Sequence, residues 1–110
     1  MIKMQIIMDE NKINSEGKYT LAKIYSTLDD FFINRLNFQK ESGGYYTGSG
    51  LPNDFGNFGI AMTTLGKKRW FMENVDTWLY FNSEDSEDPN DFVIEDFKET
   101  CLKHYYSEAS

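Results

Sequence analysis

A chain of 110 residues is close to the commonest size of one domain, so we expect a single α+β domain spanning residues 1–110. Eighteen Asp and Glu residues against eleven Lys and Arg give a net charge of −7, which disfavours direct nucleic-acid binding and favours basic protein surfaces as partners. The single cysteine, Cys101, excludes an internal disulfide. The N-terminal residues are too polar for a signal peptide or a membrane span, so we expect a cytoplasmic protein.

The first third of the chain predicts a strand followed by a helix. Met4, Ile6 and Met8 alternate with their neighbours, which indicates a strand over residues 2–8. Residues 9–18 are polar and predict a connection. A helix from about 21 to 36 follows, with Thr20 as its N-cap. Its apolar residues repeat at helical spacing: Leu21, Ile24, Tyr25, Leu28, Phe31, Phe32 and Leu36.

The middle of the chain is rich in glycine. Residues 39–53 predict a loop region, in which Tyr45, Tyr46 and Thr47 form either a short strand or the tip of a mobile loop. A second helix is expected with Asn53 or Asp54 as its N-cap and Gly66 as the C′ glycine that ends it. Its apolar face consists of Phe55, Phe58, Met62 and Leu65.

Residues 70–81 are rich in strand-forming side chains, and Glu73-Asn74 offers a turn between two strands. The second of these strands is apolar on both faces, which indicates either a central place in the sheet or a strand with one face covered by a helix and the other by a partner. After an acidic loop, Asp88 and Pro89 predict the start of a final helix that ends near Tyr106. The fold expected is a small mixed or antiparallel sheet of three to four strands, packed by about three helices.

The acidic residues concentrate near the C-terminus. Eight of the eighteen carboxylates lie in one segment: Glu84, Asp85, Glu87, Asp88, Asp91, Glu95, Asp96 and Glu99. On a helix, Asp91, Glu95 and Glu99 would share one face about 6 Å apart. This spacing is close to the roughly 7 Å between phosphates of one nucleic-acid strand, which predicts a mimic of DNA. The alternative is an ordinary solvated helix face.

No other residue pattern predicts catalysis or metal binding. An EF-hand beginning at Asp85 would place Asn90 where glycine is required and Asp96 where glutamate is required. Cys101 and His104 are three residues apart, but the chain has no further Cys or His to complete a zinc site or a catalytic centre. We therefore expect no catalytic residue, no metal and no cofactor.

Four runs of residues carry a resemblance that spans most of the chain. They are Met8-Asp9-Glu10 with Glu16-Gly17-Lys18-Tyr19-Thr20, Asp54-Phe55-Gly56-Asn57-Phe58-Gly59, Trp70-Phe71-Met72-Glu73-Asn74-Val75, and Ser83-Glu84-Asp85-Ser86-Glu87-Asp88-Pro89. In these runs the chain resembles small uncharacterised acidic accessory proteins of bacterial conjugative elements and prophages. The resemblance implies an accessory role, often that of an inhibitor of host defence of the anti-restriction or anti-CRISPR type.

The function predicted is a non-enzymatic binding protein. It would inhibit a host defence protein by occupying its basic nucleic-acid-handling surface through the acidic segment, with Tyr45 and Tyr46 as aromatic contacts. One alternative is an immunity protein or antitoxin for a cognate toxin. Another is an accessory protein with a small-ligand site in the glycine-rich region of residues 43–59.

Overall fold

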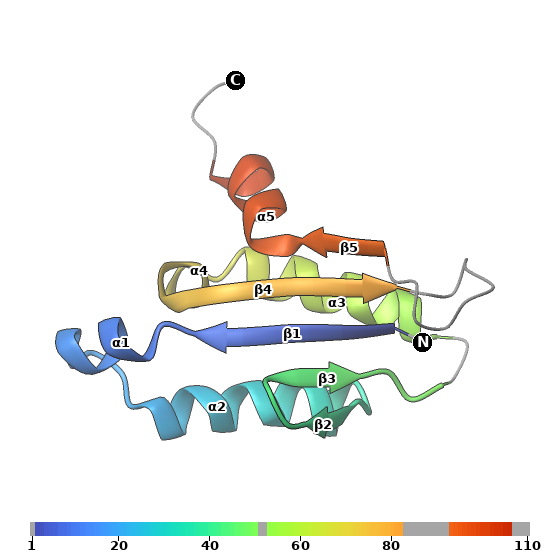
Figure 1. Ribbon diagram of the computed structural model, residues 1–110, viewed down its shortest axis with the longest axis horizontal. Helices are drawn as coiled ribbons and strands as arrows, with labels where there is room; N and C mark the ends of the chain where they lie inside the picture. Colours follow the sequence, from blue (N-terminus) through green and yellow to red (C-terminus); the bar gives the residue numbers. More distant parts are fainter. Residues whose placement is uncertain (1, 51–52, 83–92, 107–110) are drawn as a thin grey trace.

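The computed structural model describes residues 2–50, 53–82 and 93–106, and within them five strands form one sheet (Figure 1). Their order is β2-β3-β1-β4-β5, and every neighbouring pair is antiparallel. The strands are β1 (Ile2–Met8), β2 (Gln39–Glu41), β3 (Tyr45–Thr47), β4 (Val75–Asn82) and β5 (Val93–Asp96).

The helices of the described residues include two that lie behind the strands in Figure 1, α2 and α3. In chain order, all the helices of the described residues are α1 (Glu10–Glu16), α2 (Leu21–Asp29), the π-helix η1 (Asp30–Arg35), α3 (Asp54–Gly66), α4 (Arg69–Asn74) and α5 (Phe97–Tyr105). The α+β class is confirmed. The expected numbers of strands and helices were too low, because several elements are too short to show a periodic pattern. No helix in the described ranges is both long and apolar enough to cross a bilayer.

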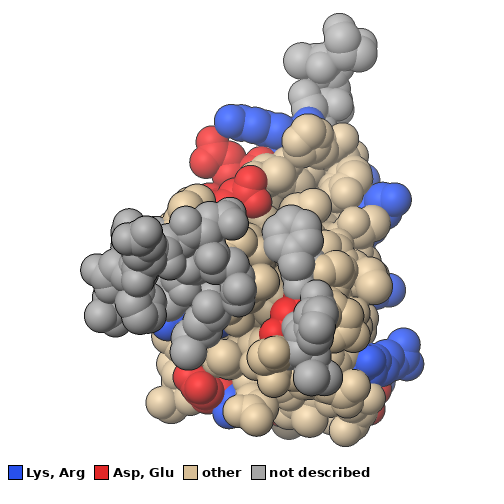
Figure 2. Space-filling model, turned by 90° about the vertical axis from the view of Figure 1, so that its right-hand side faces the viewer, with Lys and Arg blue, Asp and Glu red and all other residues tan. Residues whose placement is uncertain are grey.

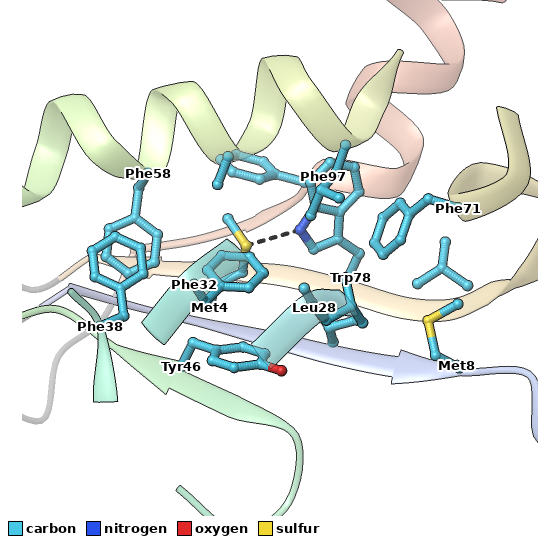
Figure 3. Packing of buried hydrophobic residues seen from close by; sticks show 14 of the residues in the cluster. Met4, Met8, Leu28, Phe32, Phe38, Tyr46, Phe58, Phe71, Trp78 and Phe97 are labelled. Carbon is cyan, nitrogen blue, oxygen red and sulfur yellow. Dashed lines mark hydrogen bonds between the residues drawn. The ribbon is translucent and has the colours of Figure 1, made fainter. Parts of the chain in front are cut away.

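Strand β1 is the strand predicted over residues 2–8, and its alternation separates the two faces of the sheet. Ile2, Met4, Ile6 and Met8 are buried in the core, whereas Ile7 is exposed on the other face. Strand β4 lies between β1 and β5, so it is an interior strand, although β1 is the middle strand of the five. Its Trp78 has no exposed surface, and the indole Nε1–H donates to the Sδ atom of Met4 at 3.0 Å (Figure 3).

Aromatic rings fill the space between the sheet and the helices. The Phe32 ring stacks on Tyr46 with centroids 4.3 Å apart, and Phe38 stacks on Phe58 at 4.2 Å. Figure 3 shows Phe58 and Phe38 side by side, although Phe58 belongs to α3 and Phe38 to the connection that precedes β2. Many of the aromatic residues of the sequence therefore pack in this core.

Two segments form helices where the sequence predicted other structures. Residues 10–16 are helix α1 rather than a connection, because Asp9 caps it by accepting from Lys12 N at 3.1 Å and Gly17 ends it with φ of 66°. Residues 69–74 are helix α4 rather than a strand and turn. Phe71 and Met72 belong to this helix and are buried in the core. Large apolar side chains of this kind fill a core equally well from a helix or from a strand.

The predicted helix of residues 21–36 is present but changes its winding. Thr20 caps it as predicted, since its Oγ1 atom accepts from Lys23 N at 3.3 Å. From Asp30 the α-helical turns give way to η1, and Leu36 N donates to Phe31 O, five residues earlier, at 3.2 Å. Such π-helical turns are rare and often lie at functional sites.

Helix α3 begins at Asp54, as predicted, but Gly66 does not stand beyond its end. Gly66 is its last helical residue, and Lys67 follows as the C-cap. A Cβ atom at residue 66 would meet Cys101 of α5, so this glycine is needed for close helix packing rather than for chain reversal. The Phe55 side chain, expected on the apolar face, lies outside the described part of the structure.

Candidate functional site

Part of the acidic segment is described by the structure. Glu95, Asp96 and Glu99 lie in or next to β5 and α5. Five of the predicted contact residues lie outside the described residues, namely Glu84, Asp85, Glu87, Asp88 and Asp91. The predicted helix over this segment is wrong for residues 93–96, because Val93–Asp96 pairs with β4 as a strand and α5 begins at Phe97.

This change of structure separates the acidic residues that a continuous helix would align. Glu95 extends from a strand, whereas Glu99 lies in the first turn of α5, so the pair does not have the helical i, i+4 spacing. Asp96 instead caps α5, with its Oδ1 atom accepting from Glu99 N at 3.0 Å. The Glu99 carboxylate pairs with Lys103 Nζ at 3.2 Å. Figure 2 shows the side of the molecule that lies on the right in Figure 1. The carboxylates visible there form separate small groups among basic and uncharged residues.

Strand β5 carries the most exposed large hydrophobic side chains of the described residues. Val93 is 70% exposed and Ile94 is 58% exposed. The strand pairs with β4 on one side, and no strand among the described residues pairs with its other side. An edge strand of this kind has free backbone donors and acceptors, so it is a place where a further strand can bind.

A hollow of about 230 Å³ lies beside β5 on the helical side of the sheet. Its walls come from α3, β4 and α5, and Glu95 is the charged member of the described lining: Phe58, Gly59, Met62, Tyr80, Glu95 and Phe97. The rings of Tyr80 and Phe97 are nearly parallel, with centroids 4.9 Å apart. We call this feature the β5 hollow. Its described lining combines apolar side chains with one carboxylate, that of Glu95.

The two tyrosines predicted as aromatic contacts lie on opposite faces of the sheet. Adjacent residues of a strand point to opposite faces, so Tyr46 enters the core while Tyr45 lies on the other side. Tyr46 is 3% exposed, and its hydroxyl donates to Asp29 Oδ1 at 2.6 Å. Burial, and then the Asp29 carboxylate, raise the pKa of the Tyr46 hydroxyl far above its usual range. Tyr46 is therefore a core residue, which corrects its prediction as a contact.

Tyr45 remains partly exposed and lies near two residues of neighbouring strands. Lys3 Nζ is 4.8 Å from the centroid of the Tyr45 ring, and the Phe81 ring is 5.9 Å away. This cation–π contact reduces the freedom of the Tyr45 ring. A pocket lined by both tyrosines would have favoured the alternative of a small-ligand site in residues 43–59, but the two rings lie on opposite faces of the sheet and do not line one pocket together.

The thiol of Cys101 is buried beneath α3. Burial, and then the charge of Glu95, raise the pKa of the Cys101 thiol to about 11. A thiol with this pKa is almost entirely protonated at neutral pH and is a poor nucleophile or metal ligand. His104 lies on the exposed side of α5. Within the described ranges, no three His, Cys, Asp or Glu side chains gather in a way that would hold a metal ion.

The glycine-rich loop before α3 binds a carboxylate of the chain itself. Asp54 accepts hydrogen bonds from Ser49 N at 3.0 Å, from Ser49 Oγ at 2.6 Å and from Gly50 N at 2.8 Å. A Cβ atom on Gly48 would lie 2.5 Å from Asp54 Oδ2. The backbone donors that resemble those of a phosphate-binding loop are thus occupied by Asp54.

Comparison with protein families, with curated proteins and with solved structures gives no match for this chain. The choice of a site therefore depends on its own geometry. Sequence reasoning predicted Glu95 as a contact and assigned Phe58, Met62 and Phe97 to helix faces, but did not bring them together. Their separation along the chain means that only the packing of α3 against β4 and α5 makes them neighbours.

Proposed function

We propose that this chain is a binding protein that recognises a basic segment of a protein partner at the corner formed by β5, α3 and α5. The observation that carries this proposal is the position of Glu95 at an otherwise apolar hollow beside the exposed Val93 and Ile94. A lysine or arginine side chain has the matching chemistry, because a long aliphatic stem precedes its charge. The stem packs in the β5 hollow and the charge lies near Glu95.

The dimensions of the hollow favour one side chain as its occupant. Sites for whole small molecules usually measure about 300–1,000 Å³, and the β5 hollow measures about 230 Å³. The aromatic walls add to the preference for a cation, since a guanidinium group stacks well on the ring of a tyrosine or phenylalanine. Tyr80 and Phe97 supply these rings.

The edge of β5 provides a second part of the same contact. A partner segment in extended conformation adds a strand to the sheet through backbone hydrogen bonds, and its side chains contact Val93 and Ile94. Alternate side chains of a strand point to the same face, so one basic residue of that segment faces the β5 hollow.

The charge of the whole chain favours a partner that handles nucleic acid. Proteins that bind nucleic acid carry basic surfaces, and a net charge of −7 attracts such surfaces over several ångströms before contact. Occupation of that surface would exclude the nucleic acid. We therefore propose inhibition of a nucleic-acid-handling protein as the outcome of binding, in agreement with the resemblance to accessory proteins of mobile elements.

The test captures partners and compares two matched pairs of variants. Wild-type protein is immobilised, exposed to nuclease-treated bacterial lysate, and the captured partner is purified for calorimetry. Glu95→Lys reverses the charge at the hollow, whereas Glu41→Lys makes the same change on β2, at the opposite edge of the sheet. Gly59→Leu places a side chain at the β5 hollow. Gly56→Leu places the same side chain on the same helix, at a residue that does not line the hollow.

We expect Glu95→Lys and Gly59→Leu each to weaken the captured partner's binding by about tenfold or more. Glu41→Lys and Gly56→Leu should stay within about threefold of wild type. Equal binding by all variants, with unchanged circular dichroism, would overturn the proposed site. A partner that binds a labelled oligonucleotide and this protein at the same time would overturn the inhibitory mechanism.

A further inference from the structure

A second concave region lies between α2–η1 and the end of α3 with α4, on the side of α3 away from the β5 hollow. Two depressions of about 220 Å³ and 250 Å³ share Thr27 and Trp70 as walls, so they are adjacent and are treated together as one groove. We call it the Trp70 groove and define it by Tyr19, Lys23, Thr27, Phe31, Lys68 and Trp70. Thr64 and Leu65 of α3 line it, whereas Phe58, Gly59 and Met62 line the β5 hollow.

The walls of the groove are aromatic and aliphatic. Tyr19 and Trp70 lie at the first depression with ring centroids 6.4 Å apart. Leu28, Leu65 and Phe31 line the second depression. Trp70 is only partly buried, although Phe71, the next residue, is fully enclosed in the core. A partly exposed tryptophan in a concave apolar surface is typical of a contact site for another protein.

The charges around the groove are opposite in sign to those of the chain as a whole. Lys23, Arg35 and Lys68 line the two depressions together with a single carboxylate, that of Asp30. Asp30 is already engaged, since it accepts from Asn34 Nδ2 at 2.9 Å and lies 3.8 Å from Arg35 Nε. The groove is therefore a positively charged region on a chain with a net charge of −7.

The π-helix η1 shapes one wall of this groove. Phe31 and Arg35 both belong to η1 and both line the second depression. π-Helical turns are rare but are frequent at functional sites. The position of η1 at the groove is an observation separate from the charges, and it supports the same surface as a binding site.

From these observations we propose that the Trp70 groove binds an acidic segment of a second protein, with one apolar side chain in each depression and carboxylates beside Lys23 and Lys68. Each depression has the volume of about one large side chain and is smaller than the usual small-molecule site. The positive lining selects an acidic sequence around these anchors. This contact is separate from the basic partner proposed for the β5 hollow.

Nucleic acid and anionic membranes are also negatively charged, but the observations favour a peptide. Both offer an extended array of charges, which the net charge of −7 would repel outside the groove. Two side-chain-sized depressions at a fixed separation instead match discrete apolar anchors, as in the binding of amphipathic helices to grooves.

The test uses a synthetic 15-residue helical peptide that carries Phe and Leu four positions apart and Glu at most other positions. Two control peptides replace the two anchors with Ala or the Glu residues with Gln. Binding is followed by the two indole N–H signals in the NMR spectrum. Trp70 borders the groove, whereas Trp78 is buried with its Nε1–H bonded to Met4, so only the Trp70 signal should shift.

We expect the acidic anchored peptide to bind and both control peptides to bind about tenfold more weakly. Lys23→Glu with Lys68→Glu should reduce the affinity by at least about tenfold, whereas Lys98→Glu on α5, outside the groove lining, should leave it nearly unchanged. Failure of the peptide to bind at millimolar concentration would overturn the proposal. So would tighter binding of an oligothymidylate or of phosphatidylserine vesicles at the same residues, or a dimer of this chain that occupies the groove.

Discussion

A Cβ atom built on Gly66 would lie 2.5 Å from the Sγ atom of Cys101, because α3 and α5 are in direct contact at these two residues. The same atom would be 3.1 Å from the Tyr105 ring and 3.2 Å from the Cys101 Cβ atom. Side-chain atoms do not approach one another this closely without a shift of the surrounding structure. Glycine at position 66 therefore sets the distance between two helices that border the β5 hollow.

The first prediction concerns this contact. Gly66→Ala should destabilise the fold by about 1–3 kcal/mol through overpacking, despite the better helix propensity of alanine. Cys101→Ala removes the Sγ atom that lies closest, so the double variant should recover part of that loss. Urea denaturation of the four proteins gives the coupling free energy. Additive effects of the two substitutions would show that the two residues do not press on each other.

The second prediction concerns Asp54, which is buried and binds three donors of the loop at residues 49 and 50. Asp54→Ala should reduce the free energy of unfolding by about 2–3 kcal/mol, because it leaves these donors without their acceptor. Asp76→Ala is the control, since Asp76 is exposed on β4. Chemical denaturation of both variants measures the difference, and equal losses would contradict the role of Asp54.

The third prediction concerns the pH dependence of stability above neutrality. The pKa of the Cys101 thiol rises from 9.0 to about 11 on folding, so the folded state holds this proton more strongly than the unfolded state. This contribution to stability is complete below about pH 9 and is lost as the pH rises through about 11.

The wild-type protein should therefore lose more stability between pH 8 and pH 11 than Cys101→Ala does. The comparison with that variant is necessary because the raised pKa of Tyr46 acts in the same direction in both proteins. Urea denaturation at a series of pH values tests the expectation. Parallel curves for the two proteins would show that the thiol does not contribute.

The fourth prediction concerns two glycines of α3 that have no packing requirement. A Cβ atom on Gly56 or Gly59 would meet no atom within 4 Å, and neither residue has a positive φ. Gly56→Ala and Gly59→Ala should each stabilise the chain by about 0.5–1 kcal/mol through helix propensity. Thermal denaturation measures the shift, and a decrease in Tm would contradict it.

The two glycines differ in what they border, which links stability to the proposed function. Gly59 lines the β5 hollow and Gly56 does not. If a partner side chain enters that hollow, glycine at position 59 keeps the space free at the expense of helix stability. Gly56→Ala and Gly59→Ala should then have similar effects on Tm and different effects on partner binding.

Local patterns predicted some elements of the fold well. The strand of residues 2–8 follows from the alternation of Met4, Ile6 and Met8 with their neighbours, and the start of α2 follows from Thr20, whose hydroxyl oxygen accepts the hydrogen bond expected of an N-cap. The site was predicted less well. Glu95 was predicted as a contact within the most acidic segment, and this stays a prediction, whereas Tyr80 and Phe58, which line the same hollow, were assigned only to the core-forming elements.

The failures share a physical cause. The residues of α4 and β5 have strand and helix preferences that differ by about 1 kcal/mol or less, so their conformation is decided by what they pack against. Val93–Asp96 forms a strand because its backbone pairs with β4. Phe71 lies in a helix because its ring is buried in the core from that position. Neither condition is visible within a window of neighbouring residues.

The sequence by itself determined the composition, the net charge of −7, the single thiol and the elements with long regular patterns, because these depend on residues close together in the chain. Only the tertiary structure decided which tyrosine is buried, why Gly66 is a glycine, and where the β5 hollow and the Trp70 groove lie. These features depend on residues far apart in sequence that line the same hollow, such as Glu95 with Phe58 and Trp70 with Thr27, and they are brought together only when the helices pack on the sheet.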